Sequence, residues 1–450
     1  MAIDPRLLTL PAAELASRLA SGALRASDLA EASLMRIAER EEAVGAFAWF
    51  DTEFVRRQAR ILDEWRGRGR ALGPLHGLPV AVVDTIDTAR VPTRNGTPAD
   101  AQRVPEADAA IMERLRAAGA LLIGKTETAE LGYRQPPRTR NPVNPAHTPG
   151  VASSGSAAAV GAGMVPLAVG VEGGGSVIGP AAYCGSVGYK PSFGSISRRG
   201  TLALAPSLDT PGVFAADVAS AAMLAEALFG YDAADPATSH APHPRLLDAA
   251  RSAPPVKPTF ALVRTPFWDQ ASADTQGALG ELAEHLAERC FEAELPAIFA
   301  ECEIHFERVL EAEMARNLVG YGQRHGALLS APLRETLERG GAILARDYLA
   351  AKDWQSVYRA GIMAILDRCD AILTPAAPGP APEGLDNVGS PVFNRLWTFA
   401  GLPTITLPLL EAENGLPMGV QLVGRLGEDA RLLRAARWLE QTILKGGTPE

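Results

Sequence analysis

Residues 149–192 read PGVASSGSAAAVGAGMVPLAVGVEGGGSVIGPAAYCGSVGYKPS and consist largely of glycine, alanine and serine. The apolar run Val165–Val171 predicts a buried strand, and a loop of small residues lies on each side of it, at 150–156 and 172–176. Because glycine lacks a Cβ atom, such loops let backbone N–H groups approach a ligand closely. Ser176 follows a run of glycines and is therefore a candidate nucleophile beside an oxyanion hole. Taken alone, the same residues fit a plain tight turn.

Strand and helix signals alternate on both sides of this stretch. Further strands are expected at Ala46–Phe50, Leu78–Val83, Ala120–Gly124, Thr259–Val263, Asp370–Leu373, Thr404–Leu407 and Gly419–Val423. Helices are expected at Leu29–Ala38, Glu53–Trp65, Asp108–Ala118, Ala216–Phe229, Thr275–Glu288, Glu303–Arg368 (broken near Gly340) and Asp429–Leu444. The alternation predicts an α/β layer structure with a mixed or mostly parallel sheet.

One intertwined domain over residues 1–450 is expected, because the last strands return to the same sheet. Its expected parts are an N-terminal helical part (1–70), a core (71–215), a flexible loop rich in Ala, Pro, Asp and His (231–257), a mainly helical insertion (258–370) and a C-terminal return to the sheet (371–450).

The composition narrows the class of protein. The chain has 450 residues, 47% of them hydrophobic, and a net charge of −9, which argues against a nucleic-acid partner. Neither a membrane-length apolar run nor a signal peptide is evident, so we expect a cytoplasmic protein. The four cysteines and seven histidines are scattered without the spacing of a metal site. We therefore expect no metal and no cofactor.

Ordered motifs along nearly the whole chain make it similar to the amidase signature family. The matching segments are Gly73–Val82, Gly124–Thr126, Gly174–Ser176, Pro180–Gly185, Gly188–Pro191, Ser207–Gly212, Leu373–Pro375, Gly401–Pro403 and Leu416–Leu422. The resemblance implies a single α/β domain, with a twisted mixed sheet between layers of helices. It also implies a Ser–cis-Ser–Lys mechanism, in which a neutral lysine activates the nucleophile through a bridging serine, since a serine hydroxyl needs a base.

The chain departs from that family pattern at two of the three catalytic positions. The lysine position of the family is Val83, and the cis-serine position is Ala152, whereas the nucleophile position is retained as Ser176. By the same resemblance, the oxyanion or ligand-binding positions are Gly173, Gly174, Gly175, Ser153, Ser154 and Ile178. The proton route of the family is therefore expected to be missing.

A substitute base is one way to keep activity. His147, Glu172 and Asp84 are the candidates in segments near the expected pocket. Ser153 is a candidate for the missing bridge, but it needs a proton acceptor behind it. Lys125 and Lys190 occupy family positions that are expected to be structural.

Three interpretations follow. In the first, the protein is a degenerate amidase, a pseudoenzyme that keeps a pocket for a small amide-like ligand or binds a partner, either a small subunit or a second copy. In the second, it is an active hydrolase of amide, carbamate or ester-like compounds, with Ser176 and a relocated base such as His147. In the third, it was inactivated deliberately, but the further changes at Val151, Glu172, Gly173 and Ile178 argue against this. We favour the first, because losing a nucleophile–base unit costs about 10⁴–10⁶ in rate.

Two structural expectations come with this interpretation. Val83, Ala152 and Ile178 replace polar family residues, so we expect them to line one apolar pocket together with Ser176. With no proton relay to maintain, we also expect the peptide bond before Ala152 or Ser153 to be trans, or at least unconstrained by a relay.

Overall fold

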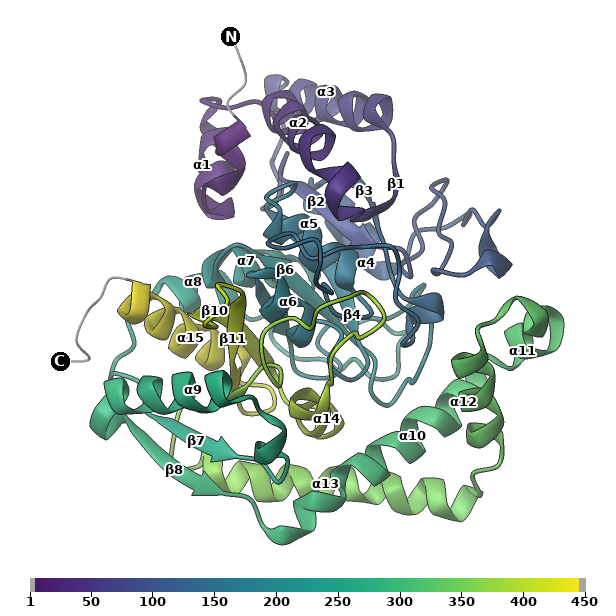
Figure 1. The fold of residues 1–450 in the computed structure, drawn as a ribbon. Coiled ribbons are helices and arrows are strands. Elements are labelled where there is room, and N and C mark those ends of the chain that lie inside the picture. The colour runs from purple at the N-terminus through teal and green to yellow at the C-terminus, as the bar shows by residue number, and fades with distance from the viewer. Residues whose placement is uncertain (1–4, 445–450) are drawn as a thin grey trace.

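A mixed sheet runs through the part of the chain that the computed structural model describes, residues 5–444 (Figure 1). Its eleven strands lie in the order β1-β3-β2-β4-β6-β5-β10-β11-β9-β7-β8. They are β1 (Phe47–Phe50), β2 (Pro79–Val83), β3 (Leu121–Thr126), β4 (Leu167–Glu172), β5 (Val187–Lys190), β6 (Thr210–Ala215), β7 (Phe260–Arg264), β8 (Cys290–Glu294), β9 (Ala371–Pro375), β10 (Thr404–Glu411) and β11 (Pro417–Val423). Pairing is parallel between β2 and its neighbours β3 and β4, and between β7 and its neighbours β8 and β9. The other strand pairs are antiparallel.

Helices cover both sides of this sheet. The α-helices are α1 (Ala12–Ser21), α2 (Ala26–Val44), α3 (Thr52–Gly67), α4 (Ala110–Ala117), α5 (Ser154–Gly161), α6 (Ile178–Cys184), α7 (Val218–Leu228), α8 (Leu246–Arg251), α9 (Ala273–Leu286), α10 (Cys302–Asn317), α11 (Val319–His325), α12 (Ala331–Gly341), α13 (Ala345–Leu366), α14 (Val392–Phe399) and α15 (Asp429–Leu444). Short 3₁₀ segments are η1 (Pro5–Thr9), η2 (Pro98–Asp100), η3 (Glu130–Gly132), η4 (Trp268–Gln270), η5 (Ala287–Arg289), η6 (Ala297–Glu301) and η7 (Gly326–Leu328).

Burial explains why the central strands form where they do. Every residue of β2 is buried, as expected of a parallel strand covered on both faces. Helices α5 and α6 pack together on the sheet, and α7, α8 and α15 form a second packed group against it. Helices α10 to α13 form an arm that projects beside the sheet (Figure 1). Their apolar side chains share one core with residues of β7, β9 and α14. The expected twisted mixed sheet between helical layers is confirmed.

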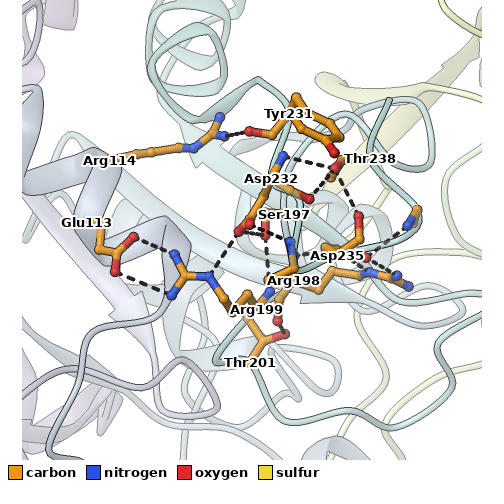
Figure 2. Close-up of polar contacts among 12 residues, drawn as sticks. Glu113, Arg114, Ser197, Arg198, Arg199, Thr201, Tyr231, Asp232, Asp235 and Thr238 are labelled. Carbon is orange, nitrogen blue, oxygen red and sulfur yellow. Dashed lines mark hydrogen bonds and ion pairs between the residues drawn. The ribbon is translucent and has the colours of Figure 1, made fainter. Parts of the chain in front are cut away.

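The segment 231–257 is not the featureless loop that its composition predicts. It contains helix α8, and a polar network holds its first residues (Figure 2). The guanidinium group of Arg198 binds the carboxylate of Asp235, and Arg199 bridges Asp232 and Glu113. The carboxylate of Asp235 is almost fully buried; although burial opposes ionisation, the hydrogen bonds from Arg198 hold its pKa at about 2. Ion pairs therefore attach this segment to the rest of the protein, although it contains few apolar residues.

Three strands and several short helices were missing from the prediction. Strands β5 and β6 lie at the centre of the sheet, and β8 lies at its edge. Within 258–370, the strand expected at Thr259–Val263 forms as β7, and the unexpected β8 pairs with it at the edge of the sheet. The predicted break near Gly340 coincides with the end of α12.

Candidate active site

Ser176 lies in the turn between strand β4 and helix α6, at the wall of a cavity of about 580 Å³. The glycine run before it is packed closely against other segments. A Cβ atom on Gly174 would lie 2.5 Å from the Phe306 ring, and Gly175 has a φ of +124°, a value that side chains rarely tolerate. The predicted residues Gly173, Gly174, Gly175 and Ala152 all line the cavity with Ser176. The glycines are therefore needed for close approach as well as for turning the chain.

Glu172 holds this turn in place and does not line the cavity. Its buried carboxylate accepts hydrogen bonds from the backbone N–H groups of Val177 and Ile178 and from the hydroxyl group of Thr398. Burial raises the pKa of Glu172, whereas the bonds from Val177 and Ile178 lower it. The structure thus gives Glu172 a positioning contact in place of the base position considered from the sequence.

The loop at 149–156 keeps an unusual backbone. The peptide bond between Val151 and Ala152 is cis, so the expectation of a trans bond was wrong. Hydrogen bonds tie this loop to neighbouring segments: the Ala152 carbonyl accepts from Ala129 N–H, and the Ser153 hydroxyl bonds to the backbone of Val171. Those bonds also occupy Ser153, the candidate bridge. Ser154 begins α5 with a buried hydroxyl that has no partner among the described residues.

The expected apolar pocket shared by Val83, Ala152 and Ile178 does not form. Only Ala152 lines the cavity beside Ser176. Val83 ends β2, where it pairs with Thr126 of β3, and packs into the main core. Ile178 begins α6 and packs against Ala182 and Ala376. Strand pairing and helix packing direct both side chains away from the cavity, so this expectation was wrong.

Two of the candidate bases are also placed elsewhere. The ring atom Nδ1 of His147 lies 2.8 Å from the Ala381 carbonyl oxygen, and His147 does not line the cavity. Asp84 is buried beside Lys125, with 3.5 Å between its Oδ1 atom and Lys125 Nζ, and its Oδ2 atom accepts from the Arg94 N–H. Neither side chain is brought to Ser176.

A second, inner cavity of about 30 Å³ also touches Ser176. Ala152, Ser153 and Asp209 are among its other lining residues. Asp209 is 4% exposed, and burial raises its pKa to about 7, against the hydrogen bonds from the N–H groups of Leu204 and Ala205, which lower it. In the sequence, Asp209 stands out only as part of a family motif, because nothing in the spacing of residues links it to Ser176.

Residues from distant segments complete the wall of the main cavity. Asn394 and Arg395 come from α14, and Phe306 and Leu310 come from α10. The Arg395 guanidinium group lies over the Phe306 ring, 5.1 Å from its centroid, and pairs with Glu303 and Glu307. No short sequence motif marks these residues, because they lie more than a hundred positions from Ser176.

Neither a metal site nor a membrane span is evident within residues 5–444. No cluster of three or more His, Cys, Asp or Glu side chains suited to holding a metal ion is found there. Within the same residues, no helix combines the length and the apolar character needed to cross a membrane.

The mixed sheet and the glycine-rich Ser176 turn define an α/β protein built on an amidase scaffold. The chain belongs to the amidase signature family, since the family's sequence model, Amidase, matches residues 28–433. One similar protein is a glutamyl-tRNA(Gln) amidotransferase subunit from Synechococcus sp. (strain WH7803), which is 33% identical over 95% of this chain and 96% of its own length.

Solved structures agree with this assignment. A protein from a vestigial complex that reveals the origins of an s-triazine catabolic enzyme superposes with a TM-score of 0.89, at 28% identity over 96% of this chain and 98% of that one. The native peptide amidase from Stenotrophomonas maltophilia superposes with a TM-score of 0.84, at 26% identity over 99% of each chain.

Proposed function

We propose that this chain is a degenerate amidase that binds a small amide-like ligand beside Ser176 and has little or no lysine-dependent hydrolysis. The observation that supports this most directly is the retained cavity, whose wall at Ser176 carries Ala152 at the expected bridge position. Its volume of about 580 Å³ suits a small molecule, because ligand pockets measure about 300–1,000 Å³. Val83 at the expected lysine position is packed into the core, so no base reaches Ser176 from there.

The expected effect of the missing base and bridge on the rate supports weak turnover. Removing members of a nucleophile–base unit costs about 10⁴–10⁶ in rate, while donors and binding alone leave about 10³ over water. Replacing a buried charge by a packed apolar side chain is often neutral or stabilising for the fold. Valine at the expected lysine position therefore costs the fold little stability, and it is acceptable in a protein that is not selected for hydrolysis.

We propose that the protein acts in the cytoplasm, alone or with a partner that is a small subunit or a second copy. The similar protein of Synechococcus is named as one subunit of an amidotransferase, and one structural neighbour comes from a complex, which supports an assembly in general terms. The net charge of −9 supports a partner other than nucleic acid.

We expect no Ser176-dependent turnover of amides. Aliphatic and aromatic amides and carbamates are incubated with the wild-type protein and with Ser176→Ala, and release of ammonia or amine is measured. The two proteins should differ by less than the assay error, because the expected base and bridge positions hold Val83 and Ala152. Turnover in the ordinary enzyme range of about 1–10³ per second, abolished in Ser176→Ala, would falsify the proposal.

We expect simple amides to stabilise the folded protein. Benzamide and propionamide should raise the melting temperature, since a ligand at about 100 times its Kd contributes about 2.7 kcal/mol. Gly174→Ala is the matched variant, because its added methyl group would meet the Phe306 ring in the cavity. A shift of equal size in both proteins would show that these amides bind elsewhere.

A further inference from the structure

The inner cavity joins Ser176 to a buried carboxyl group. We propose that Asp209, acting through a water molecule in this cavity, accepts the proton of the Ser176 hydroxyl and so makes Ser176 a slow nucleophile toward activated acyl compounds. The inference rests on the proposed function only in placing Ser176 at the ligand cavity. It goes beyond that function because it assigns a proton acceptor that neither the sequence nor the family resemblance indicates.

The hydrogen bonds of Asp209 leave one carboxyl oxygen for the cavity. Its Oδ2 atom accepts the backbone N–H groups of Leu204 and Ala205, both at 2.9 Å. Its Oδ1 atom faces the Ser176 turn, because a Cβ atom built on Gly173 would lie 3.5 Å from it. Two fixed bonds on one oxygen therefore orient the other toward the turn that carries Ser176.

The cavity between the two groups has the size and lining that a water molecule needs. Its volume is about 30 Å³, and a buried water requires about 10–15 Å³ and two to four polar partners. Ser176, Asp209 and Thr128 supply polar side chains to its wall. Ser153 lines it too, but its hydroxyl is already bonded to the backbone of Val171. A water is therefore a better relay than Ser153.

The surroundings of Asp209 suit proton exchange near neutral pH. Burial raises its pKa to about 7, and a base works best with a pKa close to the operating pH. The charged groups that act on it are Arg198, which lowers the pKa, and Glu313 of α10, which raises it. The other residues lining the inner cavity carry no titratable side chain.

The chemical step balances with an ester and water as reactants. The Oγ atom of Ser176 attacks the ester carbonyl carbon while its proton passes through the water to the Asp209 carboxylate. The carbonyl–oxygen bond to the leaving alcohol breaks, and the alcohol takes up that proton. A second water then hydrolyses the acyl-serine, which releases the acid and restores both groups. An ester is the appropriate probe, because its leaving group needs less protonation than an amine.

The test follows acylation by p-nitrophenyl acetate in the full-length protein, with mass spectrometry of the Ser176 peptide. In the wild-type protein, the Ser176-dependent rate should rise with pH and level off above about 7, where Asp209 is ionised. Asp209→Asn should lower this rate by about 10²-fold or more and remove the inflection, since a general base contributes about 10²–10⁴. Asparagine keeps an oxygen for the two backbone bonds.

The controls separate this inference from the proposed function. Ser176→Ala gives the background, and Asp217→Asn, which changes a helix cap at α7, should leave the rate unchanged. Equal acylation rates in the wild-type protein and Asp209→Asn would overturn the inference. If Asp209→Asn does not fold, the wild-type protein alone decides: an acylation rate without an inflection near pH 7 would overturn the inference. An unreactive Ser176 would also overturn it, yet would leave ligand binding intact. Rapid amide turnover would instead contradict the proposed function.

Discussion

Lys125→Met should lower the free energy of unfolding by about 3–5 kcal/mol, the usual cost of breaking a buried ion pair from one side. Lys125 is fully buried on β3, and its Nζ atom donates to the Ile86 carbonyl at 2.5 Å and to the Thr93 hydroxyl at 2.9 Å. Its loss removes the ion-pair partner of the buried Asp84 carboxyl group. Burial raises the pKa of Asp84, and the Lys125 charge is the strongest influence that lowers it.

The double variant Lys125→Met/Asp84→Asn is the matched control. Because asparagine is neutral and still accepts the Arg94 N–H, the double variant should recover part of the stability lost in Lys125→Met. Urea unfolding of the wild-type protein, both single variants and the double variant measures the coupling. A cost below about 1 kcal/mol for Lys125→Met would contradict a structural role for this lysine.

The strands with long, continuous apolar runs were predicted from the sequence. The strands that contain turn-type residues or few apolar side chains were not. β2 reads PVAVV and was expected. β6 contains Pro211 and Gly212, residues that argue against a strand, yet its backbone pairs with β4 and β5 on either side. β8 lies at the sheet edge and has no buried residue, so its side chains carry little apolar pattern. Tertiary pairing decides such strands, and local composition does not show it.

The same difference between local sequence and long-range contacts explains which residues of the candidate site were predicted. The Ser176 turn was found because its glycines, its serine and the preceding strand are contiguous in sequence. His147 lies close to the first loop in sequence, but its ring binds the carbonyl of Ala381, more than two hundred residues away. Asp209 lines the inner cavity together with Ser176 because β6 pairs with β4, in a register that sets Thr210 opposite Glu172. Long-range strand pairing thus decides which carboxyl group lines the cavity beside Ser176.

Asp209→Asn should change how stability depends on pH. The pKa of Asp209 is about 7 in the folded protein against 3.8 for the ordinary group, so the folded state binds this proton more tightly than the unfolded state does. That preference stabilises the fold fully below pH 3.8, and the benefit is lost as pH rises toward 7. Across this window the wild-type protein should lose about 1.4 kcal/mol per pH unit relative to the variant, which has no proton to release.

Urea unfolding of both proteins at intervals between about pH 4.5 and 8 measures the effect, because only the difference between them reports on Asp209. Glu172 and Glu440, whose pKa values burial also raises, titrate in both proteins and cancel. The difference should fall steadily and then level off above about 7, the pH at which ester acylation by Ser176 should also level off. If the two proteins instead show parallel stability curves, Asp209 titrates in its ordinary range and is ionised throughout. The pH inflection predicted for acylation would then not arise from Asp209.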